Sequence, residues 1–256
     1  MRMLFRFLQF RLMFDNQHTE RRFGTPARHD WTKAPRAQYR YTHIVFMARR
    51  IPQRFKHTLF GLVDRPFVSS ELAGAERPLI VHVSDTPRIS YPFVLRVVDA
   101  LEPEYLVHTG DIVDDIKLET RPQEIDAYRR QLADFIRRLE ATSAGRIYLV
   151  PGNHDVEEVI RKQSTRAVTV PAGSTLELAD LELVVSHHYD AGVDGGDFCL
   201  YGHTPEPDHH RKGDMVCLNG ISTVTVIEAP SRRTHFLPYP SGTDNVRTSL
   251  LPKPGL

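Results

Sequence analysis

The most constraining feature of this chain is a set of five polar clusters, each of which directly follows an apolar run of strand length. Such short runs are typical of buried strands in an α/β protein. Because the carboxyl ends of strands line the ligand crevice of an open α/β sheet, we expect the five clusters to meet at one edge. In chain order they are Ser84-Asp85-Thr86-Pro87, Gly110-Asp111-Ile112-Val113-Asp114, Gly152-Asn153-His154-Asp155, His187-His188 and Gly202-His203-Thr204-Pro205.

Strand and helix patterns alternate in the middle of the chain. Strand runs over 79–83, 105–108 and 147–150 alternate with helical spacing over 91–101 and 122–141. This βαβαβ order predicts a largely parallel, buried sheet. From residue 167 onward only strand patterns recur, which predicts a second, mostly antiparallel sheet. The strand runs of this later part are 167–170, 176–178, 181–186, 198–201, 215–218 and 223–227.

Charge divides the chain near residue 78. Residues 1–78 carry 15 of the 33 Lys and Arg and 6 of the 32 Asp and Glu, so the remainder carries 18 basic and 26 acidic residues. We expect a basic, partly helical or irregular extension over 1–78, a main domain over 79–240 and a flexible tail over 241–256. The overall content, 41% apolar and 25% charged, is ordinary for a globular protein and argues against a disordered or fibrous chain.

The N-terminal extension interleaves basic and apolar residues, which favours contact with an anionic membrane surface or nucleic acid. A helical wrap on the main domain is the alternative, and the first 14 residues also fit a disordered tail or coding sequence upstream of a later start. No apolar run is long enough to span a bilayer. Two cysteines, Cys199 and Cys217, indicate buried free thiols in a reducing compartment. We therefore expect a cytoplasmic protein, peripheral to a membrane if the extension binds lipid.

Carboxylates, an Asn carbonyl and imidazoles that converge in one crevice are the ligands of a divalent metal. In order and spacing, the five clusters resemble the signature of the calcineurin-like metallophosphoesterase superfamily: D-x-H, GDxxD, GNH[DE], a lone His and GHxH. The resemblance implies a four-layer αββα sandwich, in which helices flank two stacked mixed β-sheets and metals lie at one edge. It also implies an enzyme that hydrolyses phosphodiesters or phosphomonoesters.

The resemblance assigns metal ligands by position. Asp111 corresponds to the carboxylate that bridges two metals, and Asp85 to the carboxylate of the first metal. The other ligands of the second metal correspond to Asn153, His187 and His203.

Further residues receive supporting roles from the same resemblance. His154 corresponds to the histidine that stabilises charge on the substrate phosphate or protonates the leaving oxygen, and Asp155 is expected to orient its imidazole. Asp114 is expected to support Asp111 without binding a metal itself. His108 and His82, which lie in or directly after strand runs, are expected to be core or supporting histidines.

Two positions depart from the family pattern, and both belong to the first metal. Pro87 and Pro205 stand where the family has histidines, so that site keeps only Asp85 and Asp111. We expect one tightly bound ion and a second that is labile or absent, with Mn²⁺ or Mg²⁺ favoured and Zn²⁺ or Fe as alternatives at the intact site. Nearby residues that would replace the missing ligands after a rearrangement are His188, Glu206, Asp208, His209 and His210.

The sequence leaves other functions open. Activity is expected to be reduced, because two metals normally clamp both sides of a phosphoryl displacement. One alternative is a weakly active or inactive scaffold that docks through the basic extension, and another is an extension that delivers nucleic acid to the site. Neither the natural substrate nor the oligomeric state follows from the sequence.

Overall fold

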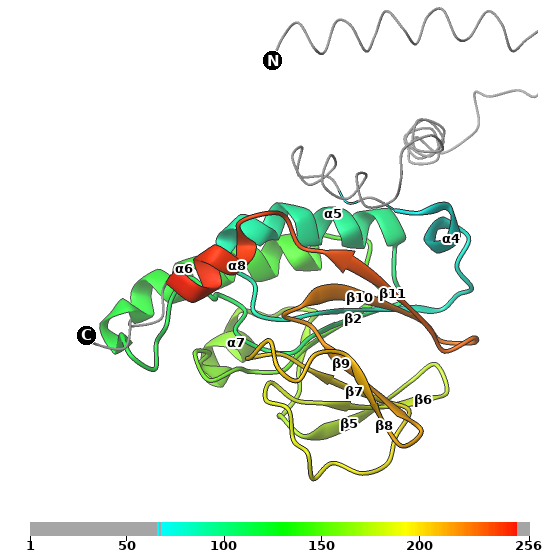
Figure 1. The fold of residues 1–256 in the computed structure, drawn as a ribbon. Coiled ribbons are helices and arrows are strands. Elements are labelled where there is room, and N and C mark those ends of the chain that lie inside the picture. Colours follow the sequence, from blue (N-terminus) through cyan, green and yellow to red (C-terminus); the bar gives the residue numbers. More distant parts are fainter. Residues whose placement is uncertain (1–65, 67, 250–256) are drawn as a thin grey trace, which may run out of the picture. The chain divides into compact units, whose positions relative to one another are not determined.

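The computed structural model describes residue 66 and residues 68–249. Within this range the chain forms two β-sheets with helices beside them (Figure 1). The predictions for residues 1–65 concern a part of the chain outside the described residues.

The first sheet has six strands in the order β11-β10-β1-β2-β3-β4. Strands β1 to β4 pair in parallel, whereas β10 and β11 add to the other side of β1 as antiparallel strands. The parallel strands confirm the βαβαβ interpretation. The bounds are β1 Leu79–Val83, β2 Tyr105–His108, β3 Arg146–Leu149, β4 Val168–Thr169, β10 Thr223–Glu228 and β11 Arg233–Pro238.

The second sheet has five strands in the order β5-β6-β7-β9-β8, and it differs from the mostly antiparallel sheet that we predicted. Pairs β5–β6 and β8–β9 are antiparallel, but β6–β7 and β7–β9 are parallel. Strands β4 and β10, which we predicted for the second sheet, belong to the first. The sequence did not reveal this, because strand periodicity reports burial and not the pairing partner. The bounds are β5 Ser174–Leu178, β6 Leu181–Val185, β7 Phe198–Tyr201, β8 His210–Lys212 and β9 Met215–Asn219.

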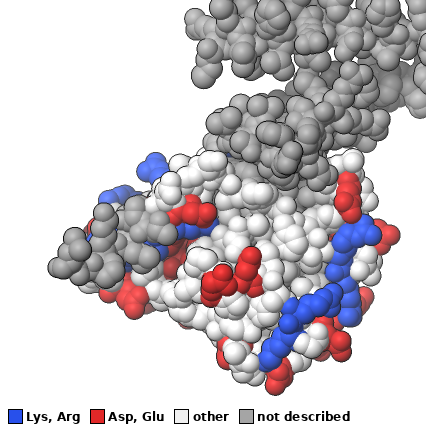
Figure 2. All heavy atoms as spheres, viewed as in Figure 1, with Lys and Arg blue, Asp and Glu red and all other residues white. Residues whose placement is uncertain are grey.

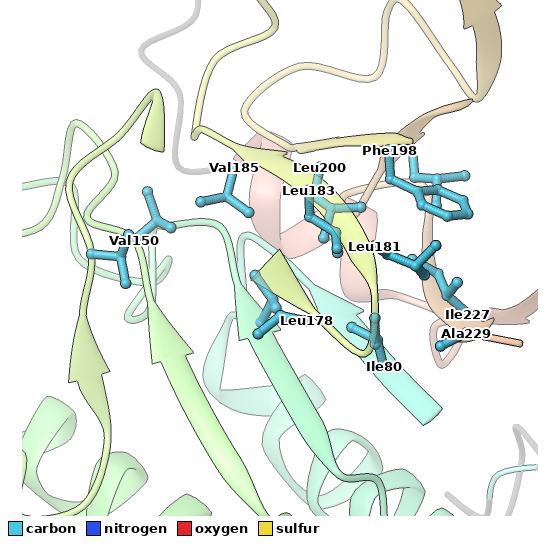
Figure 3. Packing of buried hydrophobic residues seen from close by; sticks show 13 residues of the cluster. Ile80, Val150, Leu178, Leu181, Leu183, Val185, Phe198, Leu200, Ile227 and Ala229 are labelled. Atoms are coloured by element: carbon cyan, nitrogen blue, oxygen red, sulfur yellow. The ribbon is translucent and has the colours of Figure 1, made fainter. Parts of the chain in front are cut away.

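The main core lies between the two sheets (Figure 3). Ile80 and Ile227 of the first sheet pack in one cluster with Leu183, Phe198 and Leu200 of the second. All five side chains are buried. Two stacked mixed sheets with flanking helices confirm the predicted α/β sandwich.

Helices α5 (Tyr91–Leu101) and α6 (Ile125–Glu140) lie along the first sheet (Figure 1). Each buries one apolar stripe, and the rings of Tyr91 and Phe135 stack between them with centroids 3.8 Å apart. Both helices were predicted. The shorter helices are α4 (Ser70–Ala73), α7 (Glu157–Gln163) and the 3-10 turns η3 (Arg88–Ser90) and η4 (Pro122–Glu124). Among the described residues, no helix has both the length and the apolar character needed to cross a bilayer.

The segment 241–256, which we predicted to be a flexible tail, contains helix α8 (Thr243–Ser249). Thr243 and Arg247 of this helix are buried. A helix of seven residues is too short to show a clear 3.6-residue pattern, so tertiary contacts rather than periodicity define it.

Charged side chains of both signs share the face seen in Figure 2. A run of Lys and Arg on this face is flanked by Asp and Glu, and a further group of acidic side chains lies near its centre. Interspersed charge of this kind does not create a field of a single sign. Most of the extension over 1–78, for which we predicted anionic partners, lies outside the described residues.

Candidate metal centre

The five polar clusters meet at one edge of the sandwich, as predicted. The loop after β1 is joined to the loop after β2 by a hydrogen bond from the Asp85 amide to the Gly110 carbonyl (3.0 Å). In the second sheet, the Gly202 amide donates to the His187 carbonyl (2.9 Å). Side chains from both sheets then contact each other, because His187 Nε2 lies 3.0 Å from Oδ1 of Asn153.

Three predicted ligands have a left-handed backbone, which is uncommon outside glycine. The φ angles are 49° at Asp85, 50° at Asp111 and 72° at His203. Each such residue costs of order 1–3 kcal/mol and persists only where the surrounding structure imposes it. A left-handed backbone at three predicted ligands of one cluster is typical of a functional site.

Two glycines make this close approach of the loops feasible. A Cβ atom at Gly152 would overlap the carboxylate and amide of Asp111, and one at Gly202 would overlap the side chains of Ser84 and Asp85. Only glycine lets the backbone pass so close to the two carboxylates.

His187 is the central imidazole of the cluster. Its Nδ1 lies 2.8 Å from the carbonyl oxygen of Thr109, so Nδ1 carries the proton and Nε2 presents its lone pair in the neutral ring. Nε2 faces three further ligand atoms: Oδ1 of Asn153 at 3.0 Å, Nδ1 of His203 at 3.2 Å and Oδ2 of Asp111 at 3.6 Å.

These separations fit a shared cation. Two ligand atoms that bind one ion at about 2.1 Å lie about 3.0 Å apart at right angles and about 3.4 Å apart in a tetrahedron. Burial opposes a charge on His187, but the nearby carboxylate of Asp111 outweighs it and raises the pKa of His187 to about 9. The cluster therefore attracts positive charge between these atoms. The residues fit a divalent ion.

The carboxylate of Asp85 belongs to the other half of the site. Its Oδ2 accepts hydrogen bonds from the Ser84 hydroxyl (2.7 Å) and from the His203 amide (3.0 Å). Asp85, Asp111 and His187 each offer one ligand atom within 4.8 Å of the others. Neither Pro87 nor Pro205 offers a ligating side chain, so this half is poorer in donors than the His187 half.

Most of the predicted replacement ligands are engaged elsewhere. His209 bonds to the Asn219 amide (3.0 Å) and the Thr223 hydroxyl (3.1 Å), and His210 bonds to the Asp208 carbonyl (2.8 Å) and the Tyr189 hydroxyl (3.1 Å). The exposed side chains of Glu206 and Asp208 belong to neither of the ligand clusters found among the described residues. His188 alone of the five joins one, together with His187 and His203.

His154 lies at the rim of the cluster and is almost fully buried. Its amide donates to Oδ1 of Asp111 (3.0 Å), and its ring nitrogens lie 4.0 Å from Asp111 and 3.8 Å from Glu119. Burial lowers the pKa of His154 and outweighs the opposing charge of Asp111. Glu119, which the sequence analysis missed, also accepts a hydrogen bond from Nδ2 of Asn153 (2.7 Å).

Asp155 does not orient the imidazole of His154, contrary to our prediction. Its carboxylate accepts hydrogen bonds from the amides of Gly152 (2.9 Å) and Ile112 (3.2 Å) and from the Tyr128 hydroxyl (3.0 Å). Burial, together with the charge of Asp111, raises the pKa of Asp155 to about 7. The turn at Gly152 brings the side chain back onto its own loop, so Asp155 fixes the loop backbone.

The supporting residues have specific partners. Asp114 pairs with the buried ammonium of Lys117 rather than with Asp111. His108 accepts from the Gly110 amide (3.2 Å) and bonds to the Thr86 hydroxyl (2.9 Å), so its ring joins the loops after β1 and β2. Burial lowers the pKa of His108 to about 3 and keeps this ring neutral. His82 lies in the core, as predicted.

Arg247 of α8 is a further residue that the sequence analysis missed. Its guanidinium, in a side chain that is only 6% exposed, donates to the carbonyls of Asp85 (2.9 Å), Ser84 (3.3 Å) and Ile221 (2.6 Å). The Tyr239 ring covers the guanidinium at 4.4 Å. No local pattern around Arg247 signals this contact, because its partners lie far away in the chain.

The fold and the site are those of the calcineurin-like phosphoesterase family. The model of that family matches residues 78–237, which is more than half of the chain, and the protein belongs to it. Members of this superfamily are metal-dependent hydrolases of phosphoesters.

Solved structures with similar folds share little sequence with this chain. An archaeal phosphodiesterase is 17% identical (63% of this chain, 99% of that chain, TM-score 0.46), and the phosphoesterase YfcE of E. coli is 15% identical (64% and 100%, TM-score 0.44). A Vps29 single mutant from Entamoeba histolytica is 15% identical (59% and 85%, TM-score 0.37). No curated protein matches the chain. Membership of the family therefore rests on the family model.

Proposed function

We propose that this protein hydrolyses a phosphodiester or phosphomonoester with one tightly held divalent ion and a second that is labile or absent. The observation that carries the proposal is the approach of His187 Nε2 to Asn153, His203 and Asp111 within 3.0 to 3.6 Å. Asp111, together with Asp85, forms the weaker position, which is that of the first metal in the family pattern. Mn²⁺ or Mg²⁺ suits the oxygen donors of this weaker position, and Zn²⁺ or Fe suits the imidazoles of the position at His187 and His203.

The residues of the chain divide the chemistry between them. A bound divalent ion supplies polarisation of the phosphoryl oxygens and activation of a water. Asp111 would hold an ion at either position, while the Thr109 carbonyl fixes the tautomer of His187. His154, held by its amide on Asp111, is placed to stabilise the phosphate or protonate the leaving oxygen.

A direct assay tests the proposal. We expect the parent protein to hydrolyse a bis-aryl phosphate with Mn²⁺ and to lose this activity in chelator. Asp111→Asn removes the shared charge and His154→Ala removes the proposed acid, so each should lower kcat by about 10²-fold or more. Asp126→Asn and His210→Ala are matched controls outside the site and should retain activity. Inactivity of the parent with Mn²⁺, Mg²⁺ and Zn²⁺ would overturn the proposal.

Pro87 and Pro205 favour a second candidate, a scaffold with weak or no activity that docks through its basic residues 1–78. This candidate predicts salt-dependent binding to anionic vesicles or oligonucleotides without turnover. Against it stands His154, because a pure scaffold has no chemical need for an imidazole there. Restoring histidine at both prolines is expected to raise the occupancy of the second ion.

A further inference from the structure

His188 brings a third imidazole to the metal centre, beyond the two that the family pattern provides. It follows His187 at the end of β6, and its ring centroid lies 4.0 Å from that of His203 and 4.9 Å from that of His187. One ring nitrogen of each of these three histidines lies within 4.8 Å of the others. Three imidazole nitrogens therefore lie close together, and one of them belongs to an exposed residue, His188.

The ring of His188 is free to turn toward an ion. Within the described residues no hydrogen bond engages it, whereas both ring nitrogens of His209 and of His210 are bonded to neighbours. Its side chain is exposed, and its ring contacts are with His187 and His203, the two histidines with which it would share the ion. Two atoms that bind one ion at about 2.1 Å are at most about 4.2 Å apart, so binding requires the three nitrogens, now within 4.8 Å of one another, to lie within that distance.

We propose that His188 is a direct ligand of the ion held by His187 and His203, and that the three imidazoles make this position selective for a borderline transition metal over Mg²⁺. The inference rests on the proposed function, since it takes the Asp111, Asn153, His187 and His203 site as the ion's position. Three nitrogen and two oxygen donors suit Zn²⁺, Co²⁺ or Fe²⁺. His188 thus partly offsets the imidazoles that Pro87 and Pro205 do not provide.

Co²⁺ is the probe for the test, because its visible absorption reports the ligand set without turnover. We compare the parent with His188→Ala, His188→Gln and His187→Ala, and use His210→Ala as the matched control imidazole. His188→Ala should weaken Co²⁺ binding about tenfold or more and change the absorption band. Mg²⁺ affinity, measured by competition, should change less than twofold. His210→Ala should match the parent.

The outcomes separate the inference from the proposed function. If His188→Ala binds Co²⁺ with the parent's affinity and spectrum while His187→Ala does not bind, His188 is not a ligand and the metal site stands. If neither the parent nor any variant binds Co²⁺, Zn²⁺ or Mn²⁺, the metal site itself is wrong. Because the side chain of His188 is exposed, His188→Ala and His188→Gln are expected to keep the parent's circular dichroism and melting temperature.

Discussion

At the scale of single residues, the orientation of the Asn153 amide decides whether the site presents an oxygen or an NH₂ group to an ion. Glu119 accepts a hydrogen bond from Nδ2 of Asn153 at 2.7 Å, which leaves Oδ1 facing His187 Nε2 at 3.0 Å. The same carboxylate oxygen lies 3.8 Å from the ring of His154. Glu119 therefore positions two residues of the site, although it touches no proposed metal ligand except Asn153.

Glu119→Ala should release the Asn153 amide and weaken Mn²⁺ binding about tenfold, the lower end of what the loss of such a positioning group costs. Glu119→Gln keeps an oxygen that accepts the hydrogen bond, so it should recover most of the affinity. Isothermal titration with Mn²⁺ measures both. Glu124→Ala, at the end of η4 and paired with Arg121, is the control. Equal affinity in Glu119→Ala and the parent would contradict a positioning role.

At the scale of elements, α8 holds the loop that carries Asp85. Arg247 is the contact, because its guanidinium donates to carbonyls of the loop after β1 and to Ile221, before β10. The Tyr239 hydroxyl is a further donor to the Ser84 oxygen, at 3.4 Å. The helix therefore stabilises the half of the site that is poorest in ligands.

Arg247→Ala should lower the free energy of unfolding by about 3 kcal/mol, since it leaves buried carbonyl groups without their donors. Arg247→Lys should recover part of this loss, because an ammonium keeps the charge but not the planar arrangement of donors. Urea denaturation measures the change. For comparison, the exposed Arg233 pairs with Glu71, and its replacement by Ala should cost less than about 1 kcal/mol. A cost for Arg247→Ala within that same range would show that α8 does not hold the loop.

The strands and helices that build the site were largely predictable, but their partners were not. Residues such as Asp111 and Asn153 follow buried strands, and a parallel sheet brings the ends of those strands to one edge. The position of β10 beside β1, the contact of Arg247 with Asp85 and the hydrogen bond of Glu119 with Asn153 all join residues far apart in the chain. Spacing along a sequence carries no information on such contacts.

At the scale of the whole molecule, the proposed metal centre joins the two sheets. Asp111 and Asn153 follow β2 and β3 of the first sheet, whereas His187 and His203 follow β6 and β7 of the second. Between the sheets lies the core cluster around Ile80 and Leu183 (Figure 3). An ion bound by ligands from both sides therefore binds the folded state and not the unfolded chain, and it must raise the stability of the entire sandwich.

Mn²⁺ at about 100 times its dissociation constant should stabilise the fold by about 2.7 kcal/mol, which corresponds to a rise in melting temperature of about 5 to 10 °C for a domain of this size. Chelator should reverse the rise. Asp111→Asn should abolish the metal-dependent shift, because it weakens the one ligand that both positions share. Asp126→Asn, an exposed carboxylate on α6, should retain it. A shift of the same size in Asp111→Asn would mean that Mn²⁺ stabilises the protein from another place, and the two sheets would then not be joined through this centre.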